Sequence, residues 1–228
     1  MRRALCLCVI VLCLWGVTLH NEAKLTPVSA QECVPEGKWI LIEIDLKRLT
    51  LYAGKNVVKR YPIATGAWET PSPIGVFTVV GRFKTEMSGF GTRFLKLNVP
   101  YGLYGIHGTN KPESIGSNAS HGCFRLRTKD AEELYDLVPN GTKVYIEGGA
   151  YALLGDGLRT LRSGDRQSQV IEVQKRLRLQ GFYKGAADGV YGQQTSEAVL
   201  RARKAYGLST VDVVDAALLR RLGILLFE

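Results

Sequence analysis

The sequence predicts a mainly β domain followed by a small all-α three-helix bundle. From Lys38 to about Gly148, apolar and polar residues alternate in short runs bounded by Gly or Pro, a pattern typical of β-strands. After a Gly-rich stretch, apolar residues recur at spacings of three and four, as in amphipathic helices. A chain of 228 residues is long enough for one substantial domain and one small domain.

Residues 1–30 have the order of an export signal. Two arginines precede an apolar run over residues 4–19, and Ser29 and Ala30 offer small residues at a cleavage point. The apolar run is shorter than the roughly 20 residues that a membrane span needs. This length favours a cleaved signal peptide over a retained N-terminal anchor, and we expect membrane contact only if the segment is uncleaved.

Removal of that signal leaves two cysteines, Cys33 and Cys123. Two cysteines in an exported protein suggest a disulfide. However, Cys33 lies in the lead-in before the first strand, whereas Cys123 lies in a turn rich in Gly and His. We therefore expect Cys123 to be a free thiol.

The chain is strongly basic, with a formal net charge of +9 and an isoelectric point near 9.4. Such a charge predicts attraction to an anionic partner. For an exported protein the nearby polyanions are cell-wall polymers and membrane surfaces. The chain lacks the basic and aromatic pattern of a nucleic-acid-binding module, so we expect no nucleic-acid partner.

The predicted β domain covers residues 38–147. A turn at residues 53–56 separates the first strands, and "IGVFTVVGRF", "TRFLKLNVP" and "YGLYGIHG" predict further strands. One helix interrupts them, with Thr128 as its predicted N-cap and Ala131, Leu134 and Val138 on its buried face. "TKVYIEG" predicts the final strand.

A linker is predicted over residues 148–163 and the helical bundle over residues 164–226. Val170, Val173 and Leu177 mark the buried face of the first helix, and Gly181 ends it. Thr195 is the predicted N-cap of the second helix. The predicted small-residue face of that helix consists of Ala198, Val199, Ala202 and Ala205. A third helix is predicted from about Asp212 to Leu222.

"IHG" and "SHGCFRL" bring two histidines and a cysteine into one stretch. A cysteine attacks a carbonyl as its thiolate, and His107, at a strand end, is placed to take the proton. Backbone amides around His121, Gly122 and Cys123 are candidate donors to an oxyanion. Arg125 would point to the same side of an extended segment as Cys123 and could bind a substrate carboxylate.

The residue types alone leave three interpretations open. Cys123 could be a nucleophile with a histidine base. Alternatively, the two histidines and Cys123 could bind zinc, with a carboxylate or water as fourth ligand. Cys123 could also be a buried small apolar residue.

"IHGTN" and "SHGCFRL" together resemble the signature of the L,D-transpeptidase (YkuD-type) family, which is His-Gly followed by Ser/Thr-His-Gly-Cys-x-Arg. The segments "IEIDLKRLTLYAGKNVVKRYPIATG" and "ETPSPIGVFTV" are similar to that family's opening hairpin and its Pro- and Gly-containing segment. The resemblance covers about residues 38–147 and implies an L,D-transpeptidase-like β-sandwich with one short helix. Phe124 stands where the family usually has a smaller aliphatic residue.

This resemblance implies a cysteine acyltransferase of peptidoglycan biosynthesis that needs no metal and no cofactor. It implies that Cys123 attacks the carbonyl between the third and fourth residues of a stem peptide, that terminal D-alanine leaves, and that a thioester remains. The amine of a second stem peptide would then form a 3-3 cross-link, whereas water as acceptor would make the protein an L,D-carboxypeptidase. His107 matches the proton donor and acceptor. The expected oxyanion and substrate residues are His121, Gly122, Ser120, Arg125 and Gly108.

The C-terminal segment resembles a three-helix peptidoglycan-binding module. Asp188, Gly189, Gly192 and Thr195 in "DGVYGQQTSEAV" match its most recognisable stretch. "LRARKAYGL" departs from it where the family commonly has an aromatic residue followed by glutamine. The module implies glycan strands as a partner and a location in the cell wall. A non-catalytic wall-binding protein is the alternative from a different class, and papain-like peptidases are disfavoured because His107 precedes Cys123.

Overall fold

The computed structural model describes residues 37–86, 89–148 and 158–224 of the chain. The predicted signal over residues 1–30 and Cys33 lie outside these described residues. None of the helices in the described part of the chain has the length and apolar character that crossing a membrane would require.

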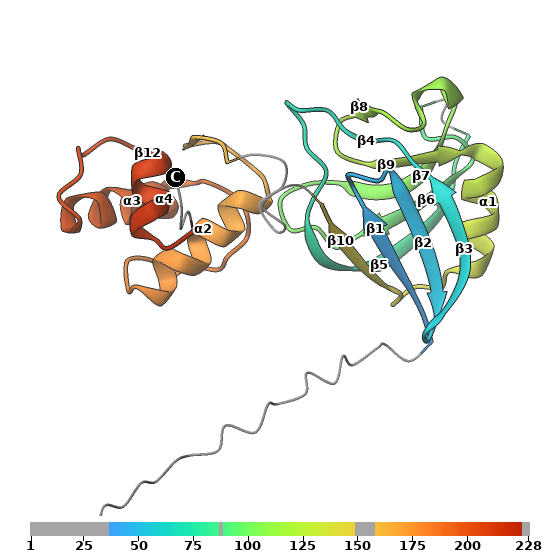
Figure 1. Cartoon of the computed structure of the whole chain (residues 1–228), viewed down its shortest axis with the longest axis horizontal. Coiled ribbons are helices and arrows are strands. Elements are labelled where there is room, and N and C mark those ends of the chain that lie inside the picture. Colours follow the sequence, from blue (N-terminus) through green and yellow to red (C-terminus); the bar gives the residue numbers. More distant parts are fainter. Residues whose placement is uncertain (1–36, 87–88, 149–157, 225–228) are drawn as a thin grey trace, which may run out of the picture. The chain divides into compact units, whose positions relative to one another are not determined.

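Residues 37–148 form a mainly β domain around one eight-stranded sheet with the strand order β3-β2-β1-β10-β5-β6-β7-β9 (Figure 1). A short parallel pair, β4 and β8, lies outside that sheet. The predicted fold class is confirmed. The strands are β1 (Lys38–Glu43), β2 (Arg48–Ala53), β3 (Asn56–Pro62), β4 (Thr65–Gly66), β5 (Gly75–Lys84), β6 (Arg93–Leu97), β7 (Tyr104–Thr109), β8 (Asn118–Ser120), β9 (Phe124–Arg127) and β10 (Lys143–Glu147).

The predicted alternation places one face of each strand in a shared core. Ile40 and Ile42 of β1 are fully buried, and the same core includes Leu95 and Leu97 of β6, three strands further along the sheet. Both halves of the sheet therefore contribute to one apolar interior, as the predicted sandwich requires. The predicted turn at residues 53–56 joins β2 to β3.

A short 3-10 helix, η1 (Pro112–Ser114), and one α-helix, α1 (Thr128–Leu137), complete this domain. Helix α1 contacts β6, β7 and β9, and Ala131, Leu134 and Val138 are buried as predicted (Figure 1). The predicted N-cap is wrong, because Thr128 is the first helical residue. Its hydroxyl instead donates to the Thr109 carbonyl oxygen at 3.1 Å and ties the helix to β7.

The C-terminal region contains three helices and a short antiparallel pair of strands. These elements are β11 (Leu161–Arg162), α2 (Ser168–Leu179), α3 (Gln193–Ala205), β12 (Val213–Val214) and α4 (Ala216–Arg221). Leu161 is buried in the core of this module, so the final residues of the predicted linker belong to the module instead. The third helix is shorter than predicted because β12 occupies its first expected residues.

Thr195 is not the N-cap of α3, since Gly192 holds that position. The Thr195 hydroxyl accepts a hydrogen bond from Gln174 Nε2 at 3.1 Å. The same Gln174 amide group also donates to Asp188 and Val190 and accepts from the Gly189 amide. Gln174 is fully buried and fixes the turn between α2 and α3.

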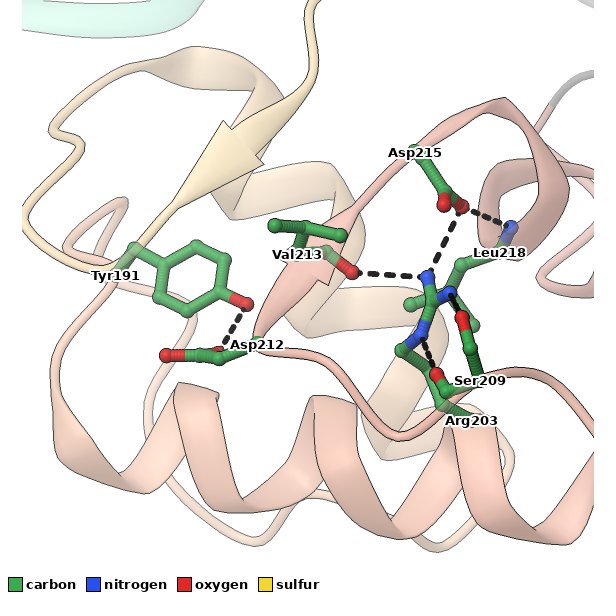
Figure 2. Close-up of polar contacts among 7 residues, drawn as sticks. All are labelled: Tyr191, Arg203, Ser209, Asp212, Val213, Asp215 and Leu218. Carbon is green, nitrogen blue, oxygen red and sulfur yellow. Dashed lines mark hydrogen bonds and ion pairs between the residues drawn. The ribbon is translucent and has the colours of Figure 1, made fainter.

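A second buried polar centre, Arg203, fixes the chain after α3 (Figure 2). Its guanidinium donates to Ser209, to the Val213 carbonyl oxygen at 3.2 Å and to Asp215 Oδ1 at 3.0 Å, while only 2% of the residue is exposed. Asp215 also accepts from the Leu218 amide and so caps α4. The predicted small-residue face is wrong at Ala205, which is exposed, whereas Arg203 is buried.

Candidate active site

Four paired residues form a row across one side of the sheet. Phe83 of β5 lies opposite Phe94 of β6, Phe94 lies opposite His107 of β7, and His107 is registered with Arg125 of β9. Paired residues on neighbouring strands present their side chains on the same face, about 5 Å apart. The sheet therefore places the His107 imidazole between an aromatic ring and a guanidinium group.

Cys123 lies two residues before Arg125, the registered partner of His107, and so belongs to the next row on the same face of the sheet. It directly precedes Phe124, whose partner on β7 is Ile106, so Cys123 comes level with Gly105. The Cys123 thiol is free and half-buried, and Sγ lies 4.0 Å from the Leu103 carbonyl oxygen. The strand register therefore places Cys123 on the segment next to β7, near the row that contains His107.

Gly122 makes the tight turn that presents Cys123. Its φ of +106° is in the region that favours glycine. A Cβ atom here would lie 2.5 Å from Cε1 of Tyr104 and 3.1 Å from the Pro71 carbonyl oxygen. The turn therefore packs directly on the Tyr104 ring, and a side chain at Gly122 would displace it.

Ser120 ties the same turn together from inside. Its hydroxyl donates to the Cys123 carbonyl oxygen at 2.6 Å and accepts from the Gly122 amide at 3.0 Å. Its own carbonyl oxygen accepts from the Ala67 amide and the Thr70 hydroxyl. These bonds fit the expected role of Ser120 in shaping the loop. They also engage the Gly122 amide, so the amides of His121 and Cys123 are the remaining candidate donors to an oxyanion.

The His107 imidazole is buried, with 3% of the residue exposed. Its ring stacks on Phe94 at 5.7 Å between centroids and meets the edge of Phe90 at 4.9 Å. Nδ1 lies 2.5 Å from the Gly108 carbonyl oxygen. Because a carbonyl oxygen only accepts, Nδ1 carries the proton, and Nε2 keeps its lone pair free to accept one.

Burial lowers the pKa of His107, the bond to Gly108 partly opposes this, and the positive charge of Arg125 adds a smaller lowering, so that the net pKa is about 4. Burial also raises the pKa of the Cys123 thiol above its ordinary value, with the Gly105 amide and Arg125 partly opposing it. At neutral pH the site therefore holds a neutral imidazole and a protonated thiol. The thiol becomes reactive when His107 removes its proton during attack.

Arg125 is held in place by its backbone. Its amide and carbonyl oxygen exchange hydrogen bonds with Ala64 at 3.0 and 2.9 Å, while β9 pairs with β7 on its other side. Its Nε is buried and has no hydrogen-bond partner among the described residues. A buried donor without a partner suits a site that a substrate acceptor completes.

The remaining expected residues lie in two different settings. His121 is exposed at the start of the turn. Gly108 is buried, and a Cβ atom there would lie 3.3 Å from the Thr128 Cα, so this glycine allows α1 to approach β7. Sequence reasoning missed Phe94 and Tyr104, although the alternation along "TRFLKL" and "YGLYGI" could have placed both beside the predicted site.

Within residues 37–86, 89–148 and 158–224, no group of three or more His, Cys, Asp and Glu side chains could hold a metal ion. His107 and His121 also differ sharply in setting, since one is buried and the other exposed.

Two family models match the chain. YkuD, described as "L,D-transpeptidase catalytic domain", matches residues 37–146. PG_binding_1, described as "Putative peptidoglycan binding domain", matches residues 166–222. The two matches correspond to the β domain and the helical module.

Similar proteins include "Putative L,D-transpeptidase YkuD" of Bacillus subtilis (strain 168), 45% identical over 107 residues that cover 47% of this chain and 64% of that protein. "Probable L,D-transpeptidase YbiS" of Escherichia coli (strain K12) is 55% identical over 139 residues, covering 50% and 45% of the two chains. A solved "L,D-transpeptidase from Mycobacterium smegmatis" has 23% identity and a TM-score of 0.44, covering 48% of this chain and 58% of that chain.

The chain spans less than two thirds of the length of these curated relatives. The matches nevertheless fall on both regions that the sequence resemblances picked out. Residues 37–146 are thus an L,D-transpeptidase catalytic domain of the YkuD family, and they are followed by a helical peptidoglycan-binding domain at residues 166–222.

Proposed function

We propose that this protein is an exported peptidoglycan L,D-transpeptidase that forms 3-3 cross-links through a thioester on Cys123. The observation that carries the proposal is the arrangement of Cys123, His107 and Arg125 on adjoining strands. A free thiol, a neutral base with an open Nε2 and a fixed guanidinium group are the parts that acyl transfer requires.

In the first step, Cys123 Sγ attacks the carbonyl carbon that joins the third and fourth residues of a donor stem peptide. His107 Nε2 takes the thiol proton and passes it to the nitrogen of the leaving residue. The C–N bond breaks, D-alanine leaves as a neutral amine, and the acyl group remains on sulfur as a thioester. His107 is then neutral again and ready for the second step.

The tetrahedral intermediate carries negative charge on the former carbonyl oxygen. We assign its stabilisation to the backbone amides of His121 and Cys123, since Ser120 engages the Gly122 amide. Arg125 is placed to attract a carboxylate of the donor, because its Nε is buried without a partner among the described residues.

The second step decides the product. Attack by the amine of another stem peptide on the thioester would form the cross-link and release Cys123, whereas attack by water would release a tripeptide. The chemistry at His107 is the same in both cases, since it removes a proton from the acceptor. The acceptor that binds best therefore decides between transpeptidase and carboxypeptidase activity.

The helical module would hold the enzyme on its insoluble substrate. A weak tether raises the local concentration of polymer around the active site, and the formal charge of +9 favours an anionic wall. We propose glycan strands as the partner of this module and the cell wall as the location of the protein.

The proposal is tested by incubating the chain without residues 1–30 with a soluble tetrapeptide muropeptide and analysing products by mass spectrometry. We expect a dimer that has lost one D-alanine, which is absent with Cys123→Ala. Monomeric tripeptide alone would identify a carboxypeptidase. Unchanged substrate with both proteins would contradict the catalytic proposal and favour a wall-binding protein.

A further inference from the structure

Two phenylalanine rings enclose the imidazole of the proposed base. Phe94 of β6 lies opposite His107 in the sheet, and its ring stacks on the imidazole with 5.7 Å between centroids and 15° between planes. Phe90, which precedes β6, meets the same imidazole at 4.9 Å and 76°. The two phenylalanine rings also contact each other, at 5.4 Å between centroids. Apolar groups from two parts of the chain therefore border the imidazole.

A glycine of β7 gives the Phe94 ring its place. A Cβ atom at Gly105 would lie 2.5 Å from Cζ of Phe94 and 2.8 Å from its Cε1, so the ring lies directly over this glycine. Cys123 comes level with Gly105 on the neighbouring segment. The Phe94 ring therefore spans the row of the base and the row of the nucleophile.

A second glycine brings the segment of Phe90 against β7. A Cβ atom at Gly91 would lie 2.8 Å from the Cα atom of Gly108 and 2.9 Å from its carbonyl carbon. The carbonyl oxygen of Gly108 is the group to which His107 Nδ1 donates. The chain beside Phe90 thus packs on the backbone that orients the imidazole.

Helix α1 anchors the same segment. The Thr92 hydroxyl donates to Glu132 Oε1 at 2.7 Å, and the Thr92 carbonyl oxygen accepts from the Thr85 amide at 3.1 Å. Glu132, the carboxylate that α1 directs to this segment, is therefore engaged by a neutral hydroxyl group. The partner that orients His107 is a backbone carbonyl oxygen instead of a carboxylate.

The charges on the strands beside His107 are positive. Arg125 of β9 is registered with His107, and the Cys123 thiol lies in the turn before β9. Lys96 of β6 shares the same face of the sheet and is exposed. Both cations would repel a protonated imidazole, so they act in the same direction as the loss of water around the ring.

We propose that Phe90 and Phe94 are positioning residues that hold His107 as an oriented, neutral base, and that they thereby extend acyl transfer into acidic solution. The inference rests on the proposed function. The two rings exclude water that a charged imidazole needs more than a neutral one does. Stacking also fixes the plane of the imidazole, so that Nδ1 stays on the Gly108 carbonyl oxygen and Nε2 remains free to accept the thiol proton.

Two effects of an aromatic neighbour on a histidine oppose each other. The face of a phenylalanine ring attracts a cation and would favour the protonated imidazole. Removal of water favours the neutral form, and burial is the largest of the causes that lower the pKa of His107 to about 4. We therefore expect the pKa to rise when either ring is truncated, because water then reaches the imidazole.

The direct test is an NMR titration of the histidine side chains in the chain without residues 1–30. That chain contains two histidines, and the exposed His121 provides a control signal in the same sample. We expect the wild-type midpoint of His107 near pH 4. Phe94→Ala should raise this midpoint by about 1–2 pH units because it admits water. Phe90→Ala should raise it by less, because Phe90 is itself only half-buried.

Phe83→Ala is the matched control. Phe83 lies opposite Phe94 on β5, but its ring lies over Gly81, where a Cβ atom would be 2.7 Å from Cε2. Its truncation should leave the midpoint of His107 unchanged. Phe94→Leu keeps an apolar group beside the imidazole and should restore most of the wild-type midpoint. If Phe94→Ala does not fold, Phe90→Ala provides the same test, since Phe90 lies outside the strands.

The same proteins are then acylated with a tetrapeptide donor, and intact-protein mass gives the rate at pH 5 and at pH 7.5. The ratio of the two rates within each protein cancels effects that are equal at both pH values. We expect a ratio near one for the wild type, because its imidazole stays mostly neutral at pH 5. Phe94→Ala should lower the ratio by about three- to tenfold, as a higher midpoint requires.

The possible results separate this inference from the proposed function. The titration requires no substrate, so an unchanged or lowered midpoint of His107 in Phe94→Ala and Phe90→Ala would overturn the inference alone. A raised midpoint with an unchanged ratio of rates would also overturn it alone. Failure of the wild type to form any acyl-enzyme at either pH would overturn the proposed function and, with it, the role of the two rings in acyl transfer.

Discussion

Acidification should destabilise the catalytic domain through a single buried histidine. Burial lowers the pKa of folded His107 to about 4, whereas an unfolded histidine has its ordinary value of 6.5. Between these two values the unfolded chain binds a proton that the folded domain does not. The free energy of unfolding is therefore unaffected by His107 above pH 6.5, falls as the pH is lowered from 6.5 to 4, and levels off below 4.

The two pKa values differ by about 2.5, and each pKa unit is worth about 1.4 kcal/mol, so His107 accounts for about 3 kcal/mol of lost stability. That is a large share of the roughly 5–15 kcal/mol that holds a typical domain folded. His107→Gln removes the titrating ring and should remove this part of the pH dependence. The remaining titratable groups titrate equally in both proteins. The difference in the free energy of unfolding between wild type and His107→Gln therefore isolates the effect of His107.

The assay is urea unfolding at pH values from 7.5 to 4, followed by tryptophan fluorescence. Without residues 1–30, the tryptophans are Trp39 and Trp68, and both lie in the catalytic domain. We expect the stability advantage of wild type over His107→Gln to shrink by about 3 kcal/mol from pH 7.5 to 4. A difference that stays constant across this range would refute the reasoning about burial of the neutral imidazole.

The remaining predictions concern the turn, the thiol and the module. Gly122→Ala should abolish measurable acylation, since its Cβ would lie 2.5 Å from Tyr104 and φ is +106°; wild-type rates would show that the turn can shift. Ser120→Ala should slow acylation by about tenfold, a loss typical of buried hydrogen bonds, and an unchanged rate would exclude its role in the turn. Cys123, whose pKa is raised by burial, should react with iodoacetamide more slowly at pH 7.5 than a free thiol does; faster alkylation would point to a thiolate. Arg203→Met should destabilise the module by about 1–3 kcal/mol, because the oxygens of Ser209 and Val213 lose their donor while the partly exposed Asp215 can be solvated; calorimetry with an unchanged module transition would contradict this. Deletion of residues 164–228 should lower activity on intact sacculi and spare soluble muropeptides, and equal losses on both would refute tethering.

Much of the catalytic domain could be predicted from alternation alone. The residues of β1 and β5 follow the period of two because one face is buried and the other is not. The buried face of the helix, with Ala131, Leu134 and Val138, could likewise be predicted from the helical spacing of apolar residues. The resemblance of "IHG" and "SHGCFRL" supplied the candidate residues, and strand pairing explains why His107 and Arg125 lie side by side.

The two N-cap predictions were wrong because the hydroxyl groups concerned bond to distant residues instead of capping their own helix. Thr128 and Thr195 have residue types that favour N-caps, yet both hydroxyls make tertiary bonds, to Thr109 and with Gln174. A sequence read by local preference alone does not contain those distant partners.

Arg203 shows the same limit in the module. Its charge predicts an exposed position, but four oxygen atoms from Ser209, Val213 and Asp215 satisfy the guanidinium in the interior (Figure 2). Since Arg203 stands in "LRARKAYGL", the departure from the family pattern falls on a buried structural residue. We infer that it affects how the module is held together more than what its surface binds.

The measurement that tests the central claim most directly is the intact-protein mass of the chain after brief exposure to a tetrapeptide donor without acceptor. The account predicts an adduct equal to the donor minus D-alanine, located on the peptide that contains Cys123 and removed by hydroxylamine. Cys123→Ala should show no adduct. An adduct on another residue, or turnover of the donor by Cys123→Ala, would contradict catalysis through this thiol.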